Sequence, residues 1–438
     1  MEDLKQHLVT QNPWWTGNKP ETGILRPDYL RKILGYLKNT REIVIIGGVR
    51  RSGKTTLMHQ TIRHLIETES VDPQHILFLP CDSSSIRDRN DPFPAVLDAF
   101  QKLTGTTEDL WLFFDEVQEI PDFSRALKNL YDTGRYHIII SGSTSHILES
   151  QSGTYLTGRF LPVHVYPLSF REYLTFRGMN IPETEIDMLT KKYELIGHLN
   201  TYIQNGGFPA ITTIEQEEIR QDYLKAYYDS ILYRDVIASH DVRNQSLMLE
   251  LMKYLITNIA APHTFRSLAQ LFKTDPVRIQ DYLSYAVDGY LLYIATKFSY
   301  SYKKQLVAPR KIYLADNGLR SAAGFVFSKD IGRLVENLVC IELLRRGYTP
   351  QYWKETNEID FVVQKPGLPL MLLNVCYASQ IPEREQKGFA EFTNLYPEVK
   401  TRKILLTEDV SMQLDDGITA VPLWRWLLMP QEIPEQKK

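Results

Sequence analysis

A glycine-rich stretch that ends in a lysine and two threonines carries the strongest chemical signal in the sequence. It reads Gly48-Val-Arg-Arg-Ser-Gly53-Lys54-Thr55-Thr56, directly after an apolar run and directly before a helical pattern. Glycines in such a loop let backbone N–H groups turn inward around a β-phosphate, and the helix N-terminus adds partial positive charge. Lys54 would reach the β- and γ-phosphates, and the Thr55 hydroxyl would ligate Mg²⁺. We therefore expect ATP contacts from Gly48, Arg50, Arg51, Ser52, Gly53, Lys54, Thr55 and Thr56.

Two adjacent acids could supply the metal and water chemistry of such a site. Asp115 and Glu116 follow the apolar run Trp111–Phe114, so we expect them at the carboxyl end of a buried strand, where open α/β sheets bind their ligands. Asp115 would hold Mg²⁺ through water, and Glu116 would orient or deprotonate the attacking water. One apolar run, His75–Pro80, separates the two motifs, which favours the additional-strand ATPases over kinases and small GTPases. Because no Asn-Lys-x-Asp guanine motif is present, adenine is the expected base.

Hydroxyl groups and one arginine are further candidates for the same site. The apolar run His137–Ile140 is followed by Ser141-Gly-Ser143-Thr, where a hydroxyl can sense the γ-phosphate or the lytic water. The sequence does not choose between Ser141 and Ser143, and a simple turn is the alternative. Arg159 precedes another apolar run and could place positive charge on a phosphate of its own or of a neighbouring subunit.

A parallel sheet is needed to position these residues, and residues 41–170 predict one. Its strands are expected at Glu42–Ile46, His75–Pro80, Leu110–Phe114, His137–Ile140 and Phe160–Tyr166. The apolar runs are nearly continuous, which is typical of strands covered on both faces. Helical patterns alternate with them at Lys54–Leu65, Pro94–Leu103 and Phe123–Asp132. This alternation predicts an α/β fold.

The rest of the chain predicts helices and then a second α/β region. Residues from about 171 to 255 are helical in pattern and charged, with a turn at Gly206–Pro209. Residues 256–310 predict two short helices followed by an apolar, basic hairpin. The last part predicts a strand at Lys311–Leu314, a helix at Ile331–Arg346 and strands near Ile359–Val363, Leu370–Val375 and Lys403–Leu406.

Composition limits the class of protein. A chain of 438 residues with 43% hydrophobic and 24% charged residues is typical of a globular protein of several domains. With 50 basic and 53 acidic residues the net charge is −3, which excludes wrapping around nucleic acid along the whole chain but leaves room for a basic patch. Cys81, Cys340 and Cys376 form neither a metal-spaced pair nor a disulfide framework. Since the N-terminus also lacks a basic signal peptide and no apolar run approaches about 18 residues, we expect a cytoplasmic protein without membrane contact.

The ordered motifs resemble a prokaryotic family, the AAA-like ATPases that carry a C-terminal DUF4143 region, and the resemblance covers nearly the whole chain. The matching stretches are Asn12–Trp15, Arg26–Leu30, Arg50-Arg51, Asp115–Gln118, Ser141–Ser143, Leu156–Arg159, Pro167–Tyr173, Gly206–Pro209, Arg234-Asp235, Lys311–Asp316 and Glu358–Phe361. The resemblance implies ATP binding and hydrolysis on an AAA-type domain, a helical and winged-helix middle, and a nuclease-like C-terminal fold. It also implies that Arg159 is an arginine finger or a sensor.

The middle of the chain predicts a helix-turn-helix, formed by Phe265–Phe272 and Pro276–Tyr285. Thr264 is the expected N-cap of its first helix. The stretch Thr296–Lys304, expected as the wing, interleaves bases with aromatics, which suits a phosphate backbone. The alternative is a winged helix used for packing or for subunit contact.

The last region resembles the PD-(D/E)xK nuclease fold. Glu336 on a helix and Asp360 on a strand match its metal-binding carboxylates. The next strand should carry an acid, one residue and a lysine, but it reads Asn374-Val375-Cys376. The site thus lacks one hard anionic ligand for Mg²⁺ and the lysine that would position water, although an amide can still donate a neutral oxygen. We expect a retained fold that serves as a scaffold or a nucleic-acid-binding surface.

We therefore predict five parts: an N-terminal segment (1–40), an AAA-like P-loop core (41–180), a lid-like helical region (181–255), a winged helix (256–310) and a degenerate nuclease-like domain (311–438). The expected function is Mg²⁺-dependent ATP hydrolysis coupled to the C-terminal modules. A nucleotide-gated DNA-binding regulator with little hydrolysis is the alternative, and an ATP-controlled nuclease is a third. The expected ligands are ATP, ADP and Mg²⁺, while homo-oligomerisation and DNA binding through the winged helix stay open.

Overall fold

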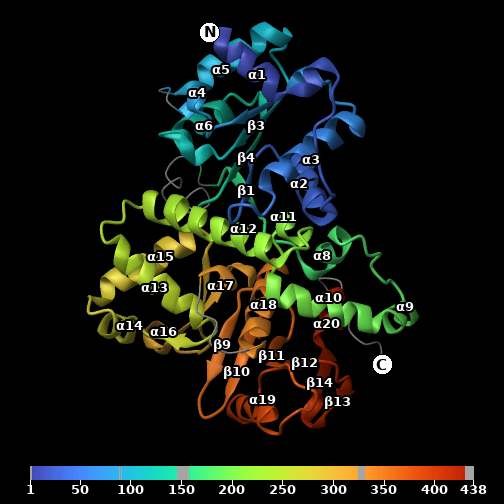
Figure 1. Ribbon diagram of the computed structural model, residues 1–438, viewed down its shortest axis with the longest axis vertical. Helices are drawn as coiled ribbons and strands as arrows, with labels where there is room; N and C mark the ends of the chain where they lie inside the picture. Colours follow the sequence, from blue (N-terminus) through green and yellow to red (C-terminus); the bar gives the residue numbers. More distant parts are fainter. Residues whose placement is uncertain are drawn as a thin grey trace. The chain divides into compact units, whose positions relative to one another are not determined.

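Two compact units make up the chain (Figure 1). The computed structural model describes residues 2–87, 89, 91–145, 156, 158–323 and 331–429. The first unit contains Met1–Val165 with Asp288–Tyr290, and the second contains Tyr166–Val287 with Leu291–Lys438. The finer division into five parts stays a prediction.

The first unit is built on a five-stranded, entirely parallel sheet in the order β2-β3-β4-β1-β5. Its strands are β1 (Ile43–Gly47), β2 (Ile76–Pro80), β3 (Leu110–Asp115), β4 (Tyr136–Gly142) and β5 (Phe160–His164). All five predicted strands and the parallel sheet are confirmed. β4 lies between β1 and β3 in the sheet although it follows both in the chain, which is the additional strand expected from the motif order.

Helices cover both faces of this sheet. They are α1 (Glu2–Gln11), α2 (Pro27–Asn39), α3 (Lys54–Glu67), α4 (Ser84–Arg87), α5 (Pro92–Thr104) and α6 (Phe123–Asp132). Successive residues of a strand point to opposite faces. Ile43 and Ile45 of β1 therefore pack in one apolar cluster with residues of α1, α5 and α6, whereas Val44 and Ile46 pack in a second cluster with residues of α2 and α3. Burial on both faces explains why the strands are apolar at almost every position.

The N-terminal motif Asn12–Trp15 covers the open edge of the sheet at β2. The Asn12 side chain is fully buried, accepts a hydrogen bond from the Phe78 amide (2.6 Å) and donates to the Phe78 carbonyl (3.0 Å). The indole N–H groups of Trp14 and Trp15 donate to the Ile76 carbonyl at 3.2 and 2.8 Å. These bonds satisfy backbone groups that an edge strand would otherwise leave unpaired.

The second unit begins with helices and continues into a mixed sheet. Its helices are α8 (Phe170–Phe176), α9 (Glu185–Thr190), α10 (Lys192–Asn205), α11 (Pro209–Thr212), α12 (Glu217–Ser230) with a π-helical continuation Ile231–Ala238, α13 (Gln245–Thr257), α14 (Phe265–Leu271), α15 (Pro276–Asp288), α16 (Tyr302–Val307), α17 (Gly318–Ala323), α18 (Ile331–Arg345), α19 (Arg384–Leu395) and α20 (Leu423–Leu428). No helix in the described part of the chain is both long and apolar enough to cross a membrane.

The sheet of the second unit has nine strands in the order β13-β14-β12-β11-β10-β9-β7-β8-β6. They are β6 (Pro262–His263), β7 (Leu292–Lys297), β8 (Arg310–Leu314), β9 (Gln351–Lys354), β10 (Glu358–Val363), β11 (Leu370–Cys376), β12 (Thr401–Thr407), β13 (Met412–Gln413) and β14 (Ile418–Pro422). The predicted hairpin differs in its second strand, because β7 pairs with β8, the strand predicted at Lys311–Leu314 in the last region. Part of the stretch expected as the wing, Thr296–Lys304, folds as α16. β7 also pairs in parallel with β9. The pair β7–β8 and the C-terminal strands therefore belong to one sheet, which extends over the domain boundary predicted at residue 310.

The predicted turn at Gly206–Pro209 is held by a carboxylate that lies far away in the sequence. Gly206 follows α10 with φ 74°, and a Cβ added there would lie 1.7 Å from Asp316 Oδ1. Asp316 accepts hydrogen bonds from the amides of Gly207 (2.6 Å) and Gly318 (2.8 Å). Burial raises the pKa of Asp316 to about 7, whereas the two amide hydrogen bonds lower it. Two motifs about a hundred residues apart thus form one buried junction.

Candidate functional site

The phosphate loop has the strand–loop–helix context that its sequence predicts. It leaves β1 after Gly47 and enters α3 at Lys54, with Gly53 capping that helix at φ 96°. Gly48 admits no side chain, because a Cβ there would lie 2.1 Å from the Val165 carbonyl oxygen. The left-handed turn at Gly53 and the close approach at Gly48 therefore explain both glycines of the motif.

Lys54 lies inside the loop with its ammonium turned toward backbone oxygens. The residue is 4% exposed, and its Nζ donates to the carbonyls of Gly48 (3.0 Å) and Val49 (3.3 Å). Glu116 Oε1 lies 3.7 Å from the same nitrogen. The buried Ser52 hydroxyl has no hydrogen-bond partner among the described residues. A buried, unpaired hydroxyl in a loop with an ammonium fits an anionic ligand such as a phosphate.

Asp115 and Thr55, the two residues predicted to hold Mg²⁺, are in direct contact. The Thr55 hydroxyl donates to Asp115 Oδ2 at 2.7 Å, and the Ser141 hydroxyl donates to Oδ1. Burial, together with the negative charge of Glu116, raises the pKa of Asp115 to about 6, while the two hydroxyl hydrogen bonds lower it. A carboxylate and a hydroxyl in contact form an oxygen donor set of the kind Mg²⁺ prefers.

Glu116 is oriented from both its backbone and its side chain. The backbone of Glu116 has a φ of 51°, and its amide donates a hydrogen bond to Ser141 Oγ at 3.0 Å. Its side-chain oxygen Oε2 accepts a hydrogen bond from Gln118 Nε2 at 2.5 Å. Burial raises the pKa of Glu116, but Lys54, the Gln118 hydrogen bond and Arg50 together outweigh this and hold it below its usual value. The Glu116 carboxylate is therefore ionised at neutral pH.

Both candidate sensor serines belong to the cluster, with different contacts. Ser141 connects Asp115 to the Glu116 amide. Ser143 Oγ accepts hydrogen bonds from Gln118 Nε2 (3.3 Å) and Arg50 Nη2 (3.5 Å). Sequence reasoning assigned no role to Gln118, and its position two residues after Glu116 is the signal that could have found it.

Arg26 is a second residue that sequence reasoning left without a role. Its Nη1 donates to the Ser52 carbonyl at 2.9 Å, and its guanidinium lies 4.5 Å from the Tyr29 ring centroid. Because Arg26 is only 3% exposed, it supports the phosphate loop from inside the fold.

The structure does not bring Arg159 to the phosphate loop of its own chain. The Arg159 carbonyl accepts a hydrogen bond from the Ile43 amide at 2.9 Å, so Arg159 lies level with the start of β1. The loop begins beyond the other end of that strand, about 16 Å away at roughly 3.3 Å per residue. The Arg159 side chain is 36% exposed, with Nε 3.8 Å from Asp132 Oδ1. Thr157, two residues before Arg159 in the same motif, lies outside the described residues.

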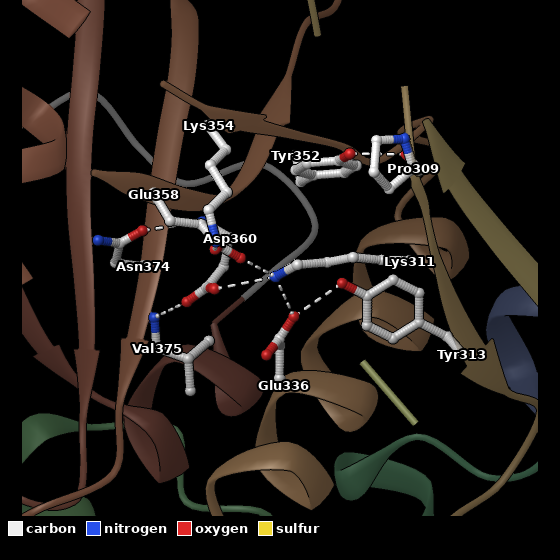
Figure 2. A network of polar contacts seen from close by, with 10 residues as sticks. All are labelled: Pro309, Lys311, Tyr313, Glu336, Tyr352, Lys354, Glu358, Asp360, Asn374 and Val375. Atoms are coloured by element: carbon white, nitrogen blue, oxygen red, sulfur yellow. Dashed lines mark hydrogen bonds and ion pairs between the residues drawn. The ribbon is translucent and has the colours of Figure 1, made fainter. Parts of the chain in front are cut away.

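Glu336 and Asp360, the candidate metal ligands of the C-terminal region, do lie together, in the second unit (Figure 2). Both contact the ammonium of Lys311, at 2.8 and 3.3 Å. Asn374 Oδ1 accepts a hydrogen bond from the Asp360 amide at 2.9 Å. The Asn374 amide oxygen, which the sequence left open as a neutral metal ligand, is thus used within the protein.

Comparison with known proteins agrees with this arrangement. Residues 40–174 match the model of a family described as AAA domain, and residues 331–426 match the domain of unknown function DUF4143. Residues 196–330 match a further domain of unknown function, DUF8612, which the sequence analysis did not anticipate. The chain is thus an AAA-domain protein with an α/β core.

Whole-chain relatives define the family. An uncharacterized protein of Methanocaldococcus jannaschii is 33% identical over 406 residues, which cover 88% of each chain. An uncharacterized protein of Haemophilus influenzae is 28% identical over 417 residues, covering 92% of this chain and 98% of that one. The chain belongs to the family of AAA-domain proteins with a C-terminal DUF4143 region.

Among solved structures, the Aeropyrum pernix Orc1 protein in complex with DNA aligns with a TM-score of 0.30 and 11% identity, covering 68% of this chain and 91% of that one. A TM-score this low supports no conclusion about this chain.

Proposed function

We propose that the first unit binds Mg·ATP and hydrolyses it. The observation that carries this proposal is the hydrogen-bonded cluster of Lys54, Thr55, Asp115, Glu116 and Ser141. These residues come from the ends of β3 and β4 and the start of α3. The cluster includes an ammonium, a hydroxyl–carboxylate pair and an ionised carboxylate. Phosphate binding, metal binding and water activation require these groups.

Each group has a distinct part in the proposed reaction. Lys54, the Ser52 hydroxyl and the loop amides would hold the phosphates, with Lys54 giving up its bonds to the loop carbonyls. Thr55 and Asp115 would hold Mg²⁺, which supplies positive charge that neutralises the phosphate oxygens. Glu116 would accept the proton of the attacking water, while Gln118 keeps its carboxylate in place.

Lys54→Ala tests the proposal, because the variant removes the ammonium and leaves the loop backbone intact. We expect ATP affinity, measured by calorimetry in the presence of Mg²⁺, to fall at least about 30-fold. Lys102→Ala is the matched control, since Lys102 lies in the same unit with a side chain that is 53% exposed and paired with Asp98. Wild-type affinity in Lys54→Ala, or an equal loss in Lys102→Ala, would overturn the proposal.

Nucleotide-gated DNA binding is a second candidate function, and one surface favours it. Tyr300 and Tyr302, in the connection between β7 and β8, are 64% and 72% exposed, and the exposed Lys303 and Lys304 follow them. Exposed aromatics beside lysines suit stacking on bases and contact with phosphates. Here the predicted winged helix would bind DNA and the nucleotide would set its affinity.

Fluorescence anisotropy with a labelled duplex tests this second function. We expect affinity to fall with rising salt, to differ between ATP and ADP, and to show a shallower salt dependence in a Lys303→Gln/Lys304→Gln variant. Affinity that is insensitive to salt, nucleotide and both lysines would reject it.

The proposal also includes a cytoplasmic location and a homo-oligomer. The location is supported by Cys81, Cys340 and Cys376, which are all buried and free of disulfides. Self-assembly is proposed because Arg159 lies away from its own site, which suits a role at the site of a neighbouring copy.

A further inference from the structure

A buried lysine lies at the centre of the carboxylate cluster in the second unit (Figure 2). Lys311, on β8, is 2% exposed. Its Nζ lies 2.6 Å from Glu358 Oε1, 2.8 Å from Glu336 Oε1 and 3.3 Å from Asp360 Oδ1. The three carboxylates come from two elements, α18 and β10, and converge on this single nitrogen.

The resemblance to a nuclease fold implies a divalent cation held by Glu336 and Asp360, but the groups present do not fit one. Asp360 Oδ2 accepts a hydrogen bond from the Val375 amide (2.9 Å), and Glu336 Oε1 accepts one from the Tyr313 hydroxyl (2.8 Å) in addition to the ammonium. Asn374 is committed to the Asp360 amide. Across the described ranges, no group of three or more His, Cys, Asp or Glu residues is arranged to hold a metal ion.

The negative charges of the three carboxylates explain why the cluster needs a cation at its centre. Buried carboxylates without a counter-charge are strongly destabilising. The ammonium of Lys311 forms an ion pair with each of the three carboxylates, so its positive charge offsets theirs inside the cluster. Lys354 adds a second positive charge at the rim, 2.8 Å from Glu358 Oε2.

We infer that Lys311 is the resident cation of this site: its ammonium takes the place of a divalent metal ion, so the second unit holds its carboxylates together without metal and is not a metal-dependent nuclease. This inference is independent of the proposed ATPase, because every residue that carries it lies in the second unit.

Manganese titration of the intact chain is the first test. The protein is prepared without nucleotide and with Asp115→Asn, which removes the carboxylate of the phosphate-loop site. We expect Mn²⁺ at millimolar concentration to leave the melting temperature unchanged, with no binding detected by electron paramagnetic resonance. Mn²⁺ binding that disappears when Asp360→Asn is added would overturn the inference, and so would Mn²⁺-dependent DNA cleavage that requires Asp360.

Lys311→Met is the second test, since methionine keeps an unbranched chain of similar length without the charge. We expect the melting temperature to fall by roughly 10 °C and to recover in part with Mn²⁺ or Ca²⁺, because the carboxylates are then without their cation. Lys354→Met is the matched control, because its side chain is 48% exposed and contacts the same cluster. It should shift by no more than about 2 °C and show no response to either metal.

Should Lys311→Met fail to fold, the double variant Lys311→Met/Glu336→Gln removes one positive and one negative charge together. It is expected to fold and to gain stability with Mn²⁺, though less than the single variant. If either variant folds and its melting temperature does not rise with Mn²⁺ or Ca²⁺, the position of the Lys311 ammonium is not a cation site. That result would overturn the inference. If neither variant folds, the manganese titration decides alone.

Discussion

Asp115 and Glu116 are neighbours in the chain, yet their surroundings shift the pKa values of their carboxyl groups in opposite directions. Asp115 is buried beside a second acid and receives hydrogen bonds from hydroxyls, so its pKa rises to about 6. Glu116 is also buried, but Lys54, Gln118 and Arg50 hold its pKa below the usual value. Two acids whose environments separate their pKa values are typical of sites that give each a different role. Here the proposed roles are metal binding for Asp115 and water activation for Glu116.

Glu116→Gln separates binding from chemistry, because the amide keeps the shape of the side chain and cannot accept the proton. We expect ATP affinity within about threefold of wild type and steady-state hydrolysis at least about 100-fold slower. Calorimetry and phosphate release measure the two quantities on one preparation. Wild-type turnover in this variant would mean that water is activated elsewhere.

Asp115 predicts a pH dependence of binding. Its pKa of about 6 in the nucleotide-free protein means that it becomes protonated, and unable to hold a cation, as pH falls through 6. The Mg²⁺-dependent part of ATP affinity should then drop up to about tenfold per pH unit below 6. Asp115→Asn, measured in parallel to account for the titration of ATP itself, should lack both the Mg²⁺ dependence and this extra pH dependence. Identical pH profiles for the two proteins would contradict the role of Asp115.

At the scale of elements, the local patterns predicted the structure well. The strands of the first sheet were predicted from short, nearly continuous apolar runs, and the phosphate loop was predicted from glycines close together in the chain. Thr264, predicted as an N-cap, accepts a hydrogen bond from the Ser267 amide at 3.0 Å. β6, β9, β13 and β14 were not predicted, and β6 has only two residues. β9 and β13 are short, and both β9 and β14 carry few of the consecutive apolar residues that mark a strand.

Long-range contacts could not be predicted from the same patterns. Lys311 contacts Glu336 and Asp360 only because β8, α18 and β10 pack together. No spacing of residues in the sequence predicts these contacts. Gln118 and Arg26 likewise acquire their roles through contacts with Glu116 and Ser52. Arg26, Gln118 and Lys311 all lie in stretches that match the family, but their roles depend on tertiary contacts, so the sequence alone assigned them no role in a site.

Gly206→Ala tests the junction between the Gly206–Pro209 turn and Asp316. The added methyl group would overlap the Asp316 carboxylate, and the φ of 74° is itself unfavourable for alanine, so we expect a loss of about 3 kcal/mol or more in the free energy of unfolding. Gly347→Ala is the matched control, with φ 77° and no atom within 4 Å of the added Cβ, and should lose about 1 kcal/mol. Urea denaturation measures both. Equal losses would mean that backbone strain, and not the contact with Asp316, makes Gly206 necessary.

At the scale of the whole molecule, the proposed role of Arg159 would connect hydrolysis to assembly. Because Arg159 lies level with the start of β1, we propose that it acts at the site of a neighbouring copy. Arg159→Ala should then bind ATP normally but hydrolyse it at least about 10-fold more slowly. Mixing it with Lys54→Ala protein should restore part of the turnover, since one contributes an intact pocket and the other an intact arginine. The exposed Arg135, also in the first unit, gives the control Arg135→Ala, which should behave as wild type.

The dependence of specific ATPase activity on protein concentration can contradict this role of Arg159. If the arginine acts between copies, the specific activity of the wild type rises with concentration as the assembly forms. A monomer whose specific activity is constant across concentration would exclude an action between copies.

The central claim is that the first unit is a Mg²⁺-dependent ATPase, and phosphate release from saturating Mg·ATP tests it most directly. Wild type and Lys54→Ala, purified side by side at a concentration that favours assembly, are compared with and without EDTA. We predict steady turnover by the wild type that EDTA abolishes and that Lys54→Ala lacks. Equal phosphate release by the two proteins, or none by a wild type that binds ATP, would contradict the claim.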